Sequence, residues 1–149
     1  MRYRHPEHGF AIDLPDDFEI YRRPPLVALL AYAPEDVREP FKAAIGVGVE
    51  DAKGADVERF TDASLVEQER DAGFQLIDRV SPGFSSGGGT RTLGHHELAG
   101  RAATVEQWRL VVGEVGYTIT TTCWTLVYET LVHAFAAAAE TFRPAEGPP

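Results

Sequence analysis

Hydrophobic and polar residues alternate most regularly in the last third of the chain. From residue 101 to 125 this alternation, interrupted around Gly113-Glu114, predicts two strands joined as a hairpin. A two-residue turn pairs Val112 with Val115, and a four-residue turn pairs Val112 with Tyr117. The two registers differ by two residues and therefore sort the side chains identically. One face is expected to belong to the core: Trp108, Leu110, Val112, Tyr117, Ile119, Thr121 and Cys123.

The opposite face of the hairpin is polar in the middle and apolar at both ends. It carries Val105, Gln107, Arg109, Val111, Thr118, Thr120, Thr122 and Trp124. Threonine ladders are common on solvated strands, so a wet sheet face explains the pattern simply. The alternative is a binding surface, because Arg and Trp can anchor a partner while Thr hydroxyls supply hydrogen bonds. The candidate binding residues are Gln107, Arg109, Thr118, Thr120, Thr122 and Trp124.

Shorter patterns predict the other elements. Strands are expected at residues 10–14, 18–22, 26–33, 41–50 and 74–80, with a short helix as the alternative at 26–33. In the strand at 41–50, Gly46 and Gly48 occupy the face opposite Phe41, Ala43, Ile45, Val47 and Val49. Something can approach the backbone closely on that glycine face.

Two helices are predicted. The first begins after the N-cap Asp56 and ends at Gly73 as its C′ residue. The second spans 127–142, and its apolar stripe requires a sheet to pack on. That stripe consists of Val127, Leu131, Ala134, Phe135, Ala138 and Phe142. Residues 34–40 form a polar connection, 81–89 form a flexible Gly-rich loop, and no element is assigned at 91–96.

Composition narrows the functional classes. The 149 residues suit one domain, expected at 1–143, with a disordered tail at 144–149. A net charge of −9 disfavours nucleic acid and anionic membranes as partners. No run approaches the roughly 20 apolar residues of a membrane span. The N-terminus lacks the apolar run of a signal peptide, and a single cysteine allows no internal disulfide. We therefore expect a cytoplasmic protein, and the Arg and Ala content hints at a GC-rich bacterial genome.

No catalytic or metal-binding constellation is recognisable. Adjacent His95 and His96 point to opposite faces of a strand and rarely chelate one ion, and His5 and His8 are expected to be a surface pair. Alternation places Cys123 in the core, as a structural thiol. Neither a G-x-S-x-G elbow nor a phosphate loop is present. We therefore expect no enzyme activity, no cofactor and no metal.

The order of elements resembles one family. The segment Phe-x-Ile-x-Leu-Pro-x-x-Phe at 10–18 is followed by a long strand at 45–50, a helix, two long strands ending in Tyr117-Thr118-Ile119-Thr120, and a last helix ending in Thr141-Phe142. This resembles the PsbP-like superfamily, which includes a photosystem II extrinsic protein, the import factor Mog and bacterial chaperones of secretion effectors. The resemblance implies an α+β domain, an antiparallel sheet with helices packed on it as an α/β/α sandwich, and an adaptor role without catalysis.

The leading hypothesis is therefore a protein-binding or chaperone-like adaptor that holds a peptide segment on the mixed hairpin face. In that case, replacing Arg109 and Trp124 weakens capture and leaves the melting temperature nearly unchanged. The alternative is a small-molecule-binding protein or modest enzyme with a pocket under the loop at 81–92, because Gly-rich loops often act as lids. A stand-alone structural domain or homodimer is the third possibility.

Overall fold

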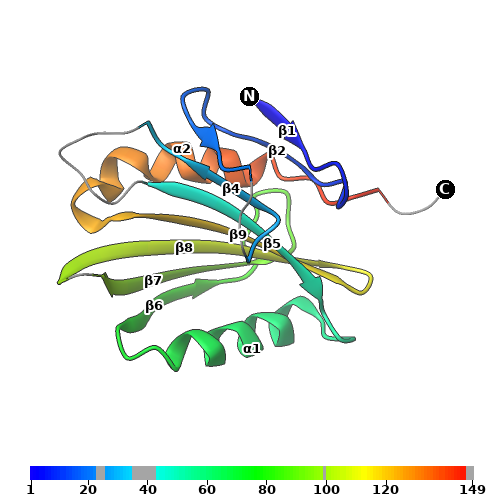
Figure 1. Cartoon of the computed structure of the whole chain (residues 1–149). Coiled ribbons are helices and arrows are strands. Elements are labelled where there is room, and N and C mark those ends of the chain that lie inside the picture. The colour runs from blue at the N-terminus through cyan, green and yellow to red at the C-terminus, as the bar shows by residue number, and fades with distance from the viewer. Residues whose placement is uncertain (23–25, 35–42, 99, 147–149) are drawn as a thin grey trace.

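The computed structural model describes residues 1–22, 26–34, 43–98 and 100–146. Its centre is a seven-stranded antiparallel sheet in the order β3-β4-β5-β9-β8-β7-β6. Helix α1 (Val57–Glu69) lies along one side of the sheet and helix α2 (Tyr128–Glu140) along the other, as Figure 1 shows. The fold is therefore α+β, with an antiparallel sheet between helices, as the sequence predicts.

The strands of the main sheet are β3 (Glu19–Ile20), β4 (Leu29–Tyr32), β5 (Ala44–Asp51), β6 (Phe74–Val80), β7 (Thr90–Leu98), β8 (Arg101–Val112) and β9 (Val115–Trp124). A separate two-stranded sheet joins β1 (Arg2–Arg4) to β2 (Ala11–Asp13). A short 3-10 turn, η1 (Thr125–Val127), leads into α2. Neither described helix is both long and apolar enough to cross a membrane.

The hairpin of β8 and β9 has the register that the two-residue turn predicts. Val112 pairs with Val115 across Gly113-Glu114, and Gly113 has the positive φ of +61° that such a turn requires. Trp108 therefore faces the same side as Ile119, and both are buried. Val112 is the exception, because it stands beside the turn and is 42% exposed.

The main core lies between the sheet and α2. Phe135, Ala138 and Ala139 of the helix join Trp108 and Ile119 of the sheet in one buried cluster. Cys123 belongs to the same cluster and is a free thiol, as expected. The predicted stripe of the last helix is wrong at two positions: Val127, at its start, and Ala134, in its middle, are exposed. The 3-10 turn precedes Tyr128, so Val127 lies outside the α-helix and its side chain leaves the buried stripe.

Helix α1 begins as predicted and ends earlier. The carboxylate of Asp56 accepts a hydrogen bond from the Arg59 amide (2.9 Å), which caps the helix. Gly73 is not the C′ residue, because the helix stops at Glu69 and Gly73 has no positive φ. The carboxylate of Asp71 accepts the Gly73 amide instead (3.0 Å) and turns the chain into β6.

Three other segments refine the prediction. The apolar run at 26–33 forms a strand only from Leu29, and Leu26 is 93% exposed rather than covered. Residues 91–96, which the sequence leaves unassigned, belong to β7. Part of the polar connection at 34–40, and Phe41, lie outside the described residues. In the predicted tail, the Ala145 amide still donates to the Tyr117 hydroxyl (3.4 Å), and residues 147–149 are not described.

Candidate binding cleft between α1 and the sheet

A cleft of about 750 Å³ opens between α1 and the adjacent face of the sheet. Four of the six predicted binding residues line it: Gln107, Arg109, Thr118 and Thr120. The hairpin face that the alternation singles out is therefore the floor of a cleft and not a flat solvated surface. We call this hollow the α1 cleft.

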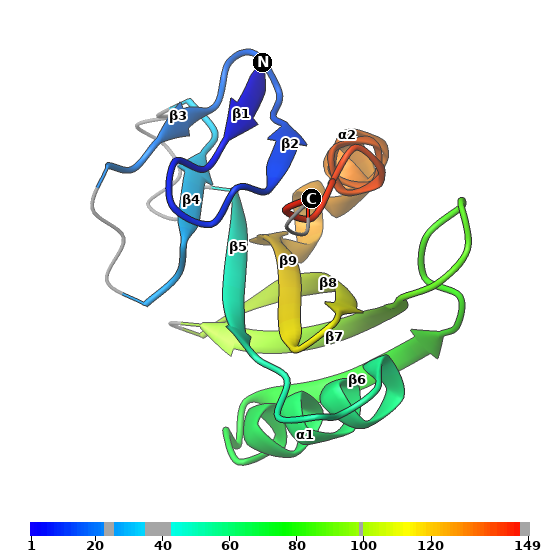
Figure 2. The ribbon, with the colours of Figure 1, turned by 90° about the vertical axis from the view of Figure 1, so that its right-hand side faces the viewer.

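Strand pairing arranges the floor of the α1 cleft in rows that cross the sheet. One row contains Gly48, Thr118, Arg109 and Thr90, and the next contains Gly46, Thr120, Gln107 and Thr92. Helix α1 packs on β6, β7 and β8, which covers the Thr90 and Thr92 ends of these rows. Figure 2 shows α1 beside β6, the edge strand, with β5 farther along the sheet. The glycine ends of the rows therefore open into the cleft.

Gly46 and Gly48 stand at strand positions where a side chain would find space. Both have ordinary strand conformations without a positive φ. A Cβ on Gly48 would come no closer than 4.0 Å to the Thr118 carbonyl oxygen, and one on Gly46 would lie 3.5 Å from the Leu29 carbonyl oxygen. Gly116 differs, because a Cβ there would lie 2.5 Å from the Phe60 ring. A side chain would therefore fit at both floor glycines, in van der Waals contact with Leu29 and Leu30 at Gly46, whereas Gly116 accommodates Phe60.

Arg109 is the charged group at the bottom of the α1 cleft, and only 1% of its surface is exposed. Its guanidinium donates to Thr92 Oγ1 (3.0 Å), to Gln107 Oε1 (2.8 Å) and to Gln68 Oε1 (3.3 Å). All three acceptors are neutral, and within the described residues Nε has no hydrogen-bond partner. Burial, and to a smaller extent the neighbouring charge of Arg79, lowers the pKa of Arg109 to about 10, while the charge of Glu50 opposes the shift. Arg109 therefore remains a cation at neutral pH.

The rim of the α1 cleft combines apolar and charged side chains. Leu26 and Val27 form the wall opposite α1, and both are exposed to solvent. The α1 wall contributes the buried ring of Phe60 and the partly exposed amide of Gln68. Charges of both signs surround the mouth: Glu50, Asp51, Lys53, Arg59 and Glu67. The cleft thus offers apolar contact at its edges and hydrogen-bonding groups on its floor.

The remaining two candidate residues lie farther along the same face. Thr122 is half-buried and pairs with Ala44 and Val105, one row beyond Gln107. Trp124 is 5% exposed, and the Arg101 guanidinium lies 4.3 Å from the centre of its ring. Neither residue lines the cleft. Because Arg109 and Trp124 are both buried, the expectation that their replacement leaves the melting temperature unchanged is not supported by their placement.

Neither of the two hollows found among the described residues lies under the loop at 81–89, where the alternative hypothesis expects a pocket. Phe84 is buried in the α2 core, and the Ser85 amide and hydroxyl donate to the Glu140 carboxylate of α2. No residue from 81 to 92 lines the α1 cleft or the second hollow, of about 690 Å³, which lies beside β1, β3 and β4. The location proposed for a small-molecule pocket therefore finds no support.

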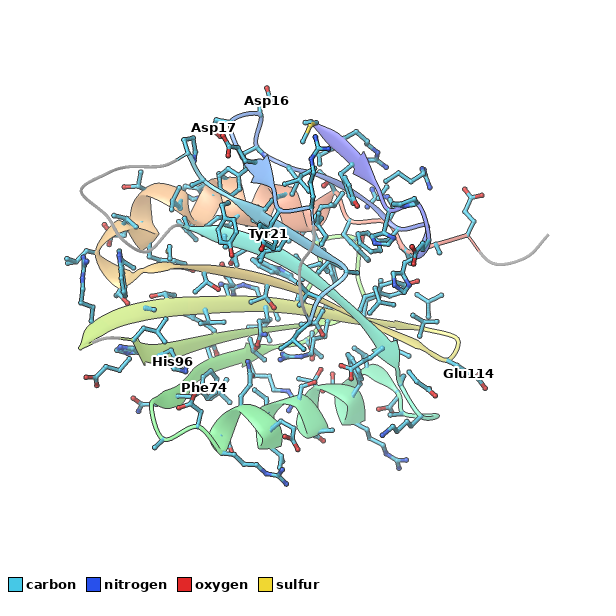
Figure 3. All side chains as sticks on the ribbon, viewed as in Figure 1. Asp16, Asp17, Tyr21, Phe74, His96 and Glu114 are labelled. Carbon is cyan, nitrogen blue, oxygen red and sulfur yellow. The ribbon has the colours of Figure 1, made fainter. Side chains whose placement is uncertain are left out.

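His5, His96 and Cys123 have structural surroundings. His96 Nε2 lies 2.9 Å from the Asp71 carboxylate, and Figure 3 shows His96 beside Phe74, at the end of the sheet away from Glu114. His5 accepts the backbone amides of Glu7 and His8 through Nδ1. Among the described residues, no three His, Cys, Asp or Glu side chains gather as a metal site. Burial, followed by the charge of Glu106, raises the pKa of the Cys123 thiol to about 11, which disfavours a nucleophilic thiolate.

The sequence patterns do not identify two polar residues, Gln68 and Glu106, whose contacts the structure shows. Gln68 reaches from α1 to Gln107 (2.7 Å) and Arg109, a contact across about forty residues that no local pattern reveals. Glu106 is 1% exposed on the α2 side of the sheet, where it bonds to Arg91 and Tyr128. Strict alternation could have found Glu106, because it stands two residues before the buried Trp108 and therefore shares its face.

Several solved structures share the fold of this chain. LpqN, involved in cell envelope biogenesis of Mycobacterium tuberculosis, matches with a TM-score of 0.71 and 15% identity over 98% of this chain and 90% of that one. Mog1 matches with a TM-score of 0.69 and 8% identity over 98% and 96%. The chain has the PsbP-like fold. CyanoP, the PsbP protein of Synechocystis, matches with a TM-score of 0.60 and 13% identity over 97% and 91%.

These similarities establish the PsbP-like fold and no more, because the identities are low. No protein-family model matches the sequence, and no curated protein does. The recognition made from the order of elements is confirmed at the level of the fold. The adaptor role that the resemblance implies therefore has to be argued from the α1 cleft of this chain.

Proposed function

We propose that this PsbP-like domain is a non-enzymatic adaptor or chaperone-like protein that holds a segment of a partner protein in the α1 cleft. The observation that carries the proposal is the open floor formed by Gly46 and Gly48 beside Thr118 and Thr120. Side-chain-free strand positions allow another backbone to approach closely, and the threonine hydroxyls can bond to it. The exposed Leu26 and Val27 add apolar contact for the side chains of that segment.

The proposal includes a cytoplasmic location and no catalysis. The single cysteine, Cys123, is a reduced thiol in the core, which suits a reducing compartment. The described residues that line the cleft include no Cys, Ser–His or His–carboxylate set, and Arg109 and the threonines are suited to hydrogen bonding rather than to proton transfer.

Site-specific photocrosslinking tests this proposal. A photoreactive residue at Thr120 should give crosslinks to a defined protein in cells of the source organism, and the same residue at exposed Glu129 on α2 should not. A Cβ on Gly48 would come no closer than 4.0 Å to any neighbouring atom, so Gly48→Leu should fill the cleft from its floor and abolish the Thr120 crosslinks. Crosslinks that persist in Gly48→Leu would show that the partner does not use the cleft.

A small-molecule ligand is the competing function for the same hollow, since its volume is within the range of ligand pockets. Thermal-shift screening of metabolites separates the two: a saturable hit that Gly48→Leu abolishes favours a small molecule. If the crosslinked species is a second copy of this chain, the domain is a homodimer that uses the cleft as its interface, and light scattering should then show the dimer mass.

A further inference from the structure

Arg109 is a buried cation whose described partners are all neutral. Ion-pair geometry is absent around it within the described residues, although Arg79 and Arg91 both pair with carboxylates in the same structure. Three oxygens of hydroxyl and amide groups satisfy its terminal nitrogens, and its Nε–H has none. Burying a guanidinium without an ion-pair partner in contact is costly, because neutral acceptors replace only part of the hydration that it loses.

One of these partners is placed so that it can be displaced. The contact from Arg109 to Gln68 Oε1, at 3.3 Å, is the longest of its three hydrogen bonds. Gln68 is partly exposed at the wall of the α1 cleft, so its side chain can turn outward. An oxygen from the cleft could then take the place of Gln68 Oε1 and also approach Nε–H.

We infer that the α1 cleft recognises a carboxylate of its bound segment, with Arg109 as the anchoring cation and Gln68 as the residue that the carboxylate displaces. This rests on the proposed function, since it assigns the chemistry of the segment held in that cleft. A carboxylate accepts two parallel hydrogen bonds from one guanidinium, which neutral acceptors on separate side chains cannot imitate.

The position of Arg109 favours an Asp or Glu side chain over a chain terminus. Its row crosses β5 at Gly48, and the cleft extends on both sides of that row, to Gly46 in one direction and past the end of β5 to Lys53 in the other. Along the strand direction the cation therefore lies between the two ends of the floor and not at either end. An extended segment that follows the strands would present an internal side chain there, with Leu26 and Val27 contacting its neighbours.

Selection from a library of random hexapeptides, flanked on both sides by Gly-Ser linkers, tests the inference on the full chain. Enrichment of Asp or Glu at one position is expected with the unmodified protein. Gln68→Glu supplies a competing carboxylate beside Arg109 and should abolish that preference. Val66→Glu adds the same charge to the outer face of α1, where Val66 is 54% exposed, and should leave the preference unchanged.

Affinity measurement with one selected peptide completes the test. Changing its acidic residue to the matching amide should weaken binding about tenfold or more, the usual scale of one charge-assisted hydrogen bond. Enriched peptides without an acidic preference would overturn the carboxylate inference and leave the adaptor function standing. Enrichment no greater than that of the blocked variant Gly48→Leu would overturn both.

Discussion

Gly48 of β5 and Arg109 of β8 lie in one row across the sheet, because Thr118 of β9 pairs with both. The row places a position without a side chain next to a hydroxyl and a buried cation. Helix α1 covers the arginine end and leaves the glycine end open. The α1 cleft is therefore a consequence of which strands the helix covers and of which residues lack bulk.

Replacing the floor glycines is expected to increase stability. A glycine inside a strand costs about 0.5–1 kcal/mol relative to alanine, through the backbone entropy lost on folding. Gly48→Ala meets no atom closer than 4.0 Å and should raise the free energy of unfolding by about that amount. Chemical denaturation at neutral pH measures it. Decreased stability would mean that the floor is packed and not open.

Gly116 provides the matched control, because it lies on the neighbouring strand β9 and its Cβ position is occupied. An added Cβ would lie 2.5 Å from two atoms of the Phe60 ring. Gly116→Ala should therefore lower the free energy of unfolding by about 1–3 kcal/mol, as overpacking does. Phe60→Leu in the same chain should recover part of the loss, since a smaller side chain relieves the contact.

Arg109 hydrogen-bonds to α1 and to the sheet, so replacing it should lower the free energy of unfolding. Arg109→Met keeps much of the apolar stem and removes the guanidinium donor from the oxygens of Thr92, Gln107 and Gln68. Gln107 Oε1 retains only its hydrogen bond from Gln68 Nε2 (2.7 Å). Hydrogen bonds to charged groups contribute about 1.5–3 kcal/mol each, and relief of the buried charge offsets part of this. We expect a net loss of about 2 kcal/mol. Arg59→Ala, on the exposed side of α1, should change stability by less than about 0.5 kcal/mol.

The two-residue period of a strand explains why the sequence predicts the two faces of the hairpin correctly. Any even shift of register preserves the sorting, so the faces follow once Gly113-Glu114 is recognised as the turn. This two-residue period does not determine whether the polar face is buried. The alternation is the same whether water or α1 covers Gln107 and Arg109, and the covering contact from Gln68 depends on how the helix packs. The cleft could therefore be predicted only as a face, and not as a hollow.

The beginning of α2 and the end of α1 could not be predicted from the hydrophobic periodicity either. Apolar spacing assigns Val127 to the last helix, yet a 3-10 turn precedes Tyr128 and rotates Val127 outward. Gly73 is a plausible helix terminator by composition, but the Asp71 carboxylate accepts its amide and the helix has already ended at Glu69. Local side-chain hydrogen bonds decide such boundaries, and periodicity does not record them.

Cys123 gives a pH dependence whose sign can be stated. Burial, and then the charge of Glu106, raises the pKa of its thiol from an ordinary value of 9.0 to about 11. The unfolded chain therefore ionises first, so the stability that the protonated thiol contributes is complete below about pH 9 and is lost as the pH rises towards 11. Urea denaturation at pH 7.5 and pH 10 should show a larger decrease for the native chain than for Cys123→Ala. Equal decreases would contradict a buried, protonated thiol.

The pair of Glu106 and Arg91 should behave as a coupled buried interaction. Glu106 is 1% exposed and the Arg91 side chain 30%, so Arg91→Met leaves a carboxylate with the Tyr128 hydroxyl as its remaining side-chain donor. Breaking a fully buried pair costs about 3–5 kcal/mol, and the partial exposure of Arg91 reduces our expectation to about 2 kcal/mol. Adding Glu106→Gln removes the charge and should recover at least about 1 kcal/mol, which a double-mutant cycle measures. Arg70 and Glu67, an exposed pair 2.9 Å apart, form the control: Arg70→Met should have almost no effect, because solvent already screens that pair.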